Sequence, residues 1–302
     1  IVSPLGNTFY SLVLKENTAK LFRKKYAEIY WGSELTNGLS AAISVSLANR
    51  NGLVNNSQKS WFRKDRFYEP NNPFNVADAE FVFLDQIFKQ SITLKWIPAQ
   101  KYQQFPGYKV RITGGYPTVY LGFEKATPLS NNYASYSKIK LSLLDSYVSA
   151  NILGFFSYRF EAAAFIDKTR VGLPDYFHFR GNDLVGGFSS PYLQTFKLQS
   201  GYEFSSTDAY VAGWFEHHFE GFINDKIPVL NKLGITGVLS CSALLRDQFS
   251  YIEPGFGVEG FKLGAIDLFR MDMFWSFQNG HYKENGFRVG FSTFFENIFG
   301  GE

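Results

Sequence analysis

The feature that most constrains this chain is an alternation of apolar and polar side chains that recurs along most of its length. The clearest instance is residues 39–48, whose odd positions are all apolar and whose even positions are serine or alanine. Successive side chains of a β-strand point to opposite faces, so a period of two predicts a strand that is apolar on one face only. One such strand is compatible with many β folds, and the repetition decides between them.

The alternation returns in later segments, where charged side chains fall on the polar face each time. These segments are residues 92–96, 119–124, 135–143, 156–164, 269–277 and 287–295. The charged residues concerned are Lys95, Glu124, Lys138, Lys140, Arg159, Glu161, Arg270, Asp272 and Arg288. Charges are costly inside a dry soluble core but are natural around a water-filled lumen. The pattern therefore predicts an all-β fold, a transmembrane antiparallel β-barrel with these charges facing the lumen.

Composition favours the same fold. Aromatic residues make up 19% of the 302 residues, with 33 Phe and 18 Tyr, and aromatic side chains typically form girdles where a barrel meets the membrane interface. No apolar run approaches the roughly 20 residues of a transmembrane helix. We expect lipid or interface contacts for Trp31, Trp96, Tyr158 and Trp275. A soluble sandwich or propeller is the alternative, and it would need the aromatic residues to face a core.

Less regular segments complete a count of about eleven or twelve strands. They are residues 195–204, 209–219, 233–244 and 254–261, while residues 26–35 alternate with period two. Asn37-Gly38 is typical of a tight hairpin turn, and residues 1–25 are expected to form a loop or helix. Long connections, residues 50–88 and 168–206, are expected on the extracellular side together with residues 278–285, while tight turns such as Leu263-Gly264 face the periplasm. Residues 1–302 are thus expected to form one outer-membrane barrel domain.

The sequence gives little support for catalysis, metal binding or a cofactor. His217 and His218 are adjacent, so on a strand they point to opposite faces and cannot share one ion. Cys241 is the only cysteine and cannot form an intrachain disulfide. The scattered basic residues, with a formal charge of +3, do not indicate nucleic acid. An outer-membrane lipase or acyltransferase is a minor alternative.

Several motifs resemble known outer-membrane families. Phe179-Arg180-Gly181, together with residues 256–269 and the final strand 287–295, resembles the BamA/TamA-type outer-membrane assembly barrels over about the last 130 residues. The resemblance implies a bacterial outer-membrane location, a sixteen-stranded barrel of which this chain is the C-terminal part, and a long loop, residues 168–206, folded into the lumen. It also implies a loop latch of Phe179, Arg180 and Gly181, with Glu216 as the acidic partner. An Arg-Gly pair is also common in ordinary turns.

The chain departs from that pattern in two ways. The segment 233–244 offers Ser240, Cys241 and Ser242 where a second acid is expected, and about five strands would lie upstream of Ile1, so the sheet formed by these residues alone should be open. More narrowly, residues 4–12, 175–177, 215–221 and 226–233 resemble an uncharacterised Bacteroidota family of outer-membrane proteins. Members of that family carry a carboxypeptidase-regulatory-like domain ahead of the barrel.

These resemblances suggest a barrel that helps to insert or translocate other outer-membrane or surface proteins. A weak seam at the final strand, around Phe287, Val289, Gly290 and Phe291, would let an incoming strand pair with the open edge. The expected partners are outer-membrane lipid and lipopolysaccharide, with client proteins or envelope complex subunits. The alternative is a passive pore or a structural barrel subunit of a larger complex.

Overall fold

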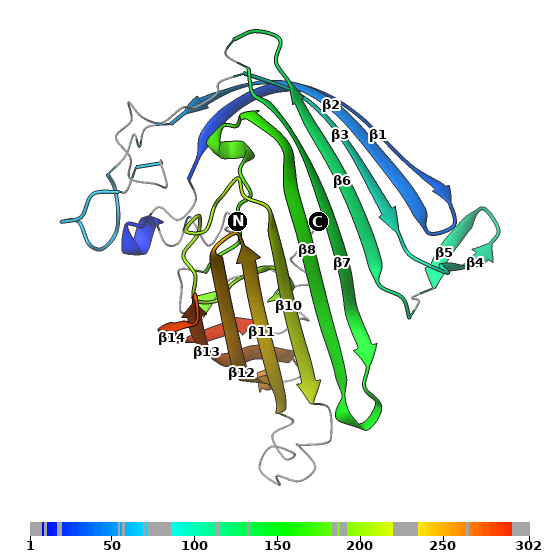
Figure 1. Ribbon diagram of the computed structural model, residues 1–302. Coiled ribbons are helices and arrows are strands. Elements are labelled where there is room, and N and C mark those ends of the chain that lie inside the picture. The colour runs from blue at the N-terminus through cyan, green and yellow to red at the C-terminus, as the bar shows by residue number, and fades with distance from the viewer. Residues whose placement is uncertain are drawn as a thin grey trace.

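A computed structural model of the chain consists mainly of one long, strongly curved β-sheet (Figure 1). It describes residues 8, 11–16, 20–53, 55, 58–68, 70–71, 86–112, 115–131, 133–182, 186–187, 192–219, 235–263 and 266–291. Among these residues no helix is long and apolar enough to span a membrane.

Eleven antiparallel strands follow one another in the sheet. They are β1 (Phe22–Thr36), β2 (Leu39–Gly52), β3 (Gln86–Trp96), β6 (Thr118–Thr127), β7 (Ser135–Ser149), β8 (Phe155–Arg170), β10 (Tyr210–Phe219), β11 (Thr236–Arg246), β12 (Phe249–Leu263), β13 (Ile266–Gln278) and β14 (His281–Phe291). The two-residue strand β9 (Gly186–Gly187) joins β14 in parallel. Strands β4 (Lys101–Phe105) and β5 (Tyr108–Ile112) form a separate hairpin, and the short 3₁₀ helices are η1 (Asn151–Leu153), η2 (Leu173–Asp175) and η3 (Tyr192–Gln194).

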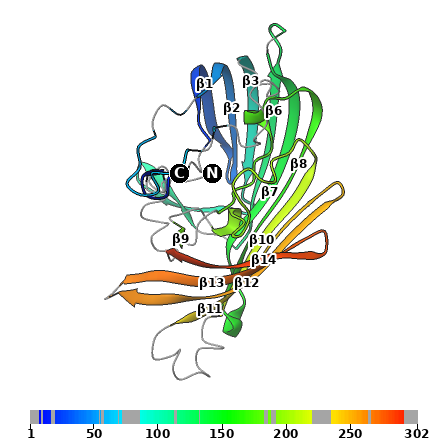
Figure 2. The same cartoon turned by 90° about the vertical axis from the view of Figure 1, so that its left-hand side faces the viewer.

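The sheet is curved but is not closed. Within the described ranges β1 pairs with β2 only, and the far side of β14 pairs with β9 rather than with β1. Figure 2 shows β1 and β14 as separate edges on either side of a concave space. The prediction of an all-β antiparallel fold is confirmed, and an open sheet is what we expected of these residues.

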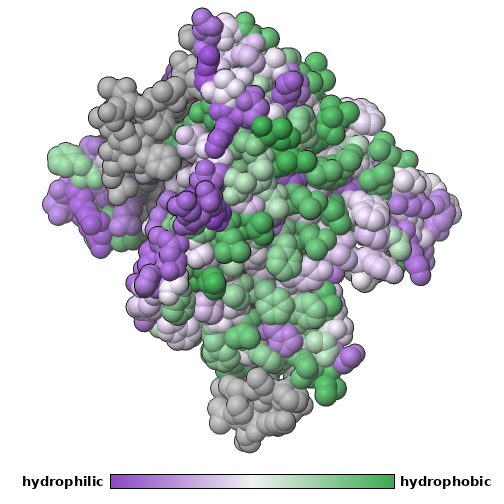
Figure 3. All heavy atoms as spheres, in the orientation of Figure 1, coloured by the Kyte–Doolittle hydropathy of each residue, from purple (hydrophilic) through white to green (hydrophobic). Residues whose placement is uncertain are grey.

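The two faces of the sheet differ in the way that the alternation predicts. Every strand from β2 to β14 in the main sheet exposes large apolar side chains on its convex face: Ile43, Ile92, Leu121, Ile139, Phe160, Val211, Leu239, Phe256, Trp275 and Phe287. Polar and charged side chains such as Ser46, Glu161, Glu216 and Asp272 are buried on the concave face. Hydrophobic side chains cover the middle of the convex face in Figure 3. This arrangement, with apolar side chains on the outer face and charges on the inner face, is the reverse of the arrangement in a soluble sheet that packs on an apolar core.

Several predicted boundaries need correction. Residues 195–204 do not form a strand, because they fold as turns against the concave face. Strand β1 begins at Phe22, inside the segment predicted as loop or helix, although residues 11–14 are helical. Residues 278–285 do not form an extended extracellular loop, because the turn at Asn279-Gly280 leads directly into β14, which begins at His281. Gly264 of the Leu263-Gly264 turn and the end of the predicted strand after residue 291 lie outside the described residues.

Candidate functional site

The segment between β8 and β10, residues 171–209, packs against the concave face, and we call it the docked loop. Its described parts are residues 171–182, 186–187 and 192–209. Phe177, Phe179, Phe196 and Phe204 from the docked loop are buried with aromatic side chains of β10 and β12. The ring of Phe179 meets Tyr210 edge-on at 4.7 Å between centroids. This apolar contact attaches the docked loop to strands β10 to β14, which we call the second half of the sheet.

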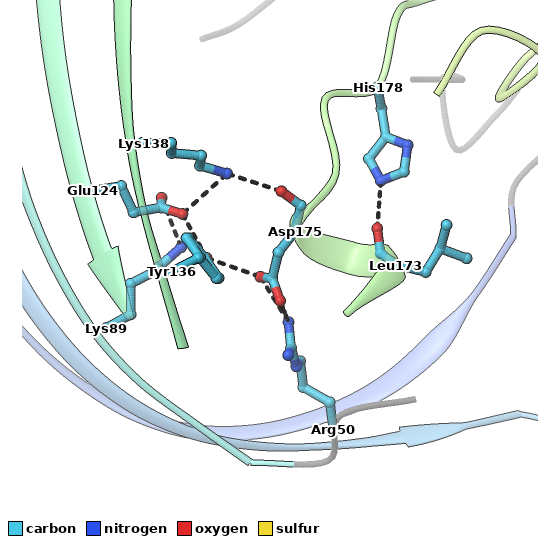
Figure 4. A network of polar contacts seen from close by, with 8 residues as sticks. All are labelled: Arg50, Lys89, Glu124, Tyr136, Lys138, Leu173, Asp175 and His178. Atoms are coloured by element: carbon cyan, nitrogen blue, oxygen red, sulfur yellow. Dashed lines mark hydrogen bonds and ion pairs between the residues drawn. The ribbon is translucent and has the colours of Figure 1, made fainter. Parts of the chain in front are cut away.

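A polar network attaches the docked loop to the first half of the sheet (Figure 4). Asp175, at the end of η2, accepts hydrogen bonds from Nη1 of Arg50 on β2, at 2.8 and 2.9 Å to its two carboxylate oxygens. The hydroxyl of Tyr136 on β7 lies 3.1 Å from the same carboxylate, and Nζ of Lys138 donates to the Asp175 carbonyl at 3.1 Å. The Arg50 and Asp175 side chains are only 4% and 6% exposed, so this ion pair is almost fully shielded from water.

The same network continues along the wall to Glu124 on β6. This carboxylate lies 2.7 Å from the Tyr136 hydroxyl and forms ion pairs with Lys89 at 3.2 Å and Lys138 at 3.1 Å. These two pairs are partly exposed, so water screens them in part. Removing one partner of the shielded Arg50–Asp175 pair would instead leave an uncompensated buried charge, which is strongly destabilising.

His178 links two parts of the docked loop, the outgoing arm of residues 171–182 and the returning arm of residues 192–209. Its Nε2 lies 2.9 Å from the Leu173 carbonyl, and its Nδ1 lies 2.8 Å from Oγ of Ser205 on the returning arm. The carbonyl can only accept, so Nε2 carries the hydrogen in this arrangement. Burial lowers the pKa of His178, against the opposing effect of the Leu173 carbonyl, and this favours the neutral ring.

The returning arm is held by Glu253 on β12, a fully buried carboxylate. It accepts the backbone N–H groups of Lys197 and Leu198, the latter at 2.9 Å, and the Tyr251 hydroxyl at 2.7 Å. Arg288 on β14 donates from Nε to the Lys197 carbonyl at 2.6 Å. Burial lowers the pKa of the Lys197 ammonium to about 8. A buried carboxylate thus holds backbone donors that lie outside any strand.

Beneath this arm lies a chain of paired polar side chains on β10, β12 and β13. Arg270 forms ion pairs with Glu216 at 2.8 Å and with Asp272 at 2.9 Å. His218 lies 2.6 Å from Glu259. No group of three or more His, Cys, Asp or Glu side chains that could hold a metal ion occurs in the part of the chain that the structure describes. The wall is built from ion pairs and hydrogen bonds.

The expected loop latch is wrong in its pairing. Glu216 pairs with Arg270, and the ion pairs of the described residues do not include one between Arg180 and Glu216. The backbone of Arg180 instead bridges to Thr195, with Phe196 N–H donating to its carbonyl at 2.9 Å. The physical reason is that Arg270 on β13 reaches Glu216 on β10 across the concave face, although β11 and β12 lie between these strands in the sheet, and both side chains are nearly fully buried.

The other two members of the expected latch lie in the docked loop and are tightly packed. Phe179 belongs to its aromatic core. A side chain on Gly181 would place Cβ 2.6 Å from the Ser200 carbonyl oxygen and closer still to that of Gln199, so only glycine fits there.

The nine charges expected to share a face do so in the strand register. Lys95, Glu124, Lys138, Lys140, Arg159, Glu161, Arg270, Asp272 and Arg288 all lie on the concave face. Glu161 pairs with Lys140 at 2.8 Å and Arg159 at 2.6 Å, while Lys95 lies over the Tyr120 ring. Each of the other five takes part in the contacts described above.

The residues expected at the barrel seam lie on β14. Phe287 is exposed on the convex face, and the backbones of Val289 and Gly290 pair with Gly186 and Gly187 of β9. The side chain of Phe291 lies outside the described residues. The described part of this edge is therefore occupied in part by the docked loop.

The sequence analysis did not predict the residues that attach the docked loop to the first half of the sheet, although the alternation gave a signal for one of them. Arg50 lies two residues beyond the regular alternation of residues 39–48 and keeps its even parity, which places it on the concave face with Ser46 and Ala48. Asp175 belongs to the motif of residues 175–177, whose residue types give no indication of a partner for its carboxylate. Glu253 precedes Pro254 and Gly255, which hide the alternation of β12.

Comparison with known proteins places the chain in a family. No curated protein matches it. A family model described as "Family of unknown function (DUF5686) C-terminal domain" matches residues 1–258 of the 302, well over half of the chain. The chain therefore belongs to the DUF5686 C-terminal domain family, a family of unknown function.

Proposed function

We propose that this chain is part of a bacterial outer-membrane β-barrel that aids the insertion or translocation of outer-membrane or surface proteins. In this proposal the convex face contacts lipid and lipopolysaccharide, and the concave face borders a lumen that the docked loop partly fills. The barrel would be completed by further strands, and it would act without a cofactor, as a scaffold for its client rather than as an enzyme.

The observation that carries the proposal is the polarity of the two faces. Ten successive strands present exposed apolar side chains outward, while ion pairs such as Arg270–Glu216 are buried on the concave side. An exposed apolar surface this continuous is unusual for a soluble monomer and has the polarity of a lipid-facing barrel wall. Trp31, Trp96 and Trp275 are all exposed on that face, as expected for interfacial aromatic side chains.

The open edges support the assembly role. β1 is 15 residues long and almost entirely exposed, and β2 is its one neighbour within the described ranges. An edge of this length presents N–H and C=O groups with which a further strand can pair, either a strand that completes the barrel or, where that pairing opens, a strand of the client. The motifs that resemble BamA/TamA-type barrels and the Bacteroidota outer-membrane family point the same way.

Reconstitution in lipid vesicles tests this role. An unfolded outer-membrane β-barrel protein is added to vesicles with and without the chain, and its insertion is followed by protection from protease. We expect faster insertion in the presence of the chain. Unchanged insertion kinetics, with the chain itself inserted in the vesicles, would contradict the assembly role.

The second candidate is a passive pore or a structural subunit of a larger envelope complex. It is favoured by the unequal cover of the concave face, since the docked loop buries Tyr210 and Trp214 whereas Tyr26 and Tyr30 on β1 stay exposed. Lumen charges such as Lys95 would then set solute preference. Solute flux through reconstituted vesicles without any gain in client insertion would favour this candidate over the first.

A further inference from the structure

We infer that Asp175 is a curvature clamp, which holds the first half of the sheet in its bent form and thereby sets the position of β1. The inference concerns the shape of the sheet, so it does not depend on whether the convex face lies in a membrane.

The first step of the argument is the span of the contacts. Arg50 is on β2 and Tyr136 is on β7, and in the sheet β3 and β6 lie between these strands. Three inter-strand steps amount to roughly 14 Å along the sheet. One carboxylate nevertheless lies within 3.1 Å of both side chains. In the bent sheet one group touches both side chains, as in Figure 4, so these contacts favour the bent form over a flatter one.

The second step is the difference between the two attachments of the docked loop. Toward the second half of the sheet it is fixed by an extensive aromatic core, with Phe196 against Trp214 at 5.3 Å and against Tyr251 at 5.6 Å. Toward β2 it makes the ion pair of Arg50 with Asp175, and Val171 packs against a small apolar cluster that includes Ala48. The docked loop therefore belongs mechanically to the second half, and its polar attachment is where the first half can separate from it.

The third step links the clamp to the edge. β1 pairs with β2 along its whole length, from Phe22 with Gly52 to Thr36 with Leu39, so β1 follows any movement of β2. Release of Asp175 should therefore flatten the arc from β2 to β7 and move β1 outward with it. This makes the docked loop a device that controls how far apart the two edges of the sheet stand.

Distances between spin labels test the clamp directly. In a Cys241→Ser background, labels at Ala27→Cys on β1 and Ile166→Cys on β8 report the arc, because both positions are exposed near the level of Asp175. We expect Asp175→Asn to lengthen or broaden their distance distribution by roughly one strand spacing, about 5 Å. An unchanged distribution overturns the inference.

A second label pair separates flattening from general unfolding. Val211→Cys on β10 and Phe277→Cys on β13 report the half of the sheet that carries the aromatic core, and their distance should not change in the Asp175→Asn protein. Equal broadening of both label pairs means loss of the fold rather than release of a clamp, and it also overturns the inference.

Two further variants make the test specific. Glu203→Gln removes another loop-to-strand ion pair, with Lys283 on β14 at 2.6 Å, but one that does not span the arc, so it should leave the Ala27 to Ile166 distance unchanged. Arg50→Gln should reproduce the Asp175→Asn shift, and the double variant should add nothing to it, because both act on one interaction. A shift with Glu203→Gln, or additive shifts in the double variant, would contradict the clamp.

Discussion

Replacing Glu253 by glutamine should release the returning arm of the docked loop without unfolding the sheet. The carboxylate accepts the N–H groups of Lys197 and Leu198 and the Tyr251 hydroxyl, and it is fully buried. Glutamine keeps the shape but turns one acceptor into a donor, which then faces a backbone donor or the hydroxyl. Hydrogen bonds to a charged group contribute about 1.5 to 3 kcal/mol each, so we expect a cost of about 3 kcal/mol for docking of this arm.

Hydrogen exchange measures this cost at the affected amides. A loss of about 3 kcal/mol corresponds to roughly a hundredfold faster exchange at Lys197 and Leu198, with much smaller changes in β12 itself. Glu284→Gln on β14 is the matched control, since it makes the same change on a carboxylate that is about half exposed. Unchanged protection of the two amides in the Glu253→Gln protein would refute the role that we assign to this carboxylate.

Three further perturbations follow from the same contacts. Gly181→Ala should lower the thermal stability of the docked loop by an amount equivalent to about 2 kcal/mol or more, because its Cβ would meet the Ser200 carbonyl; an unchanged melting temperature would contradict that packing. The pKa of Lys197 is about 8 when docked and about 10.5 when the loop is free, so the free state binds more protons between these values. Docking should therefore become stronger as pH rises from about 8 to about 10.5, measured by proteolysis of the loop, and Lys197→Met should remove that dependence. If the convex face contacts lipid, Phe256→Arg should cost about 2 to 4 kcal/mol of folding free energy in vesicles, measured by denaturant titration, and a neutral effect would argue against lipid contact.

The arrangement of the strands was largely predictable from residue types alone. The alternation in segments such as 39–48 and 156–164 depends on strand geometry, which places successive side chains on opposite faces whatever the surrounding fold. The same parity placed Glu161 and Asp272 on one face with the other charges. Strand ends were less predictable because β1 continues through Arg23, Lys24 and Lys25, charged residues that gave no apolar alternation.

The attachments of the docked loop were not predictable in the same way. Residues 195–204 carry aromatic side chains at spacings that fit a strand, but Phe196 and Phe204 pack into an aromatic core formed with residues more than ten positions away. The partner of Glu216 was equally hidden, since Arg270 comes into reach only through the order of β10 to β13 in the sheet. Pairings of this kind depend on tertiary position, which no local pattern encodes.

The proposed membrane-facing wall has a direct test at the native cysteine. Cys241 is exposed on the convex face of β11, and its neighbour Ser242 is buried on the concave face. A fluorophore is attached to Cys241 in the protein reconstituted in vesicles, and to a Cys241→Ser, Ser242→Cys variant as the matched control. We predict that spin-labelled acyl chains quench the fluorophore at position 241 strongly and at position 242 weakly. Quenching of position 241 by aqueous iodide but not by labelled lipid would contradict a lipid-facing convex wall.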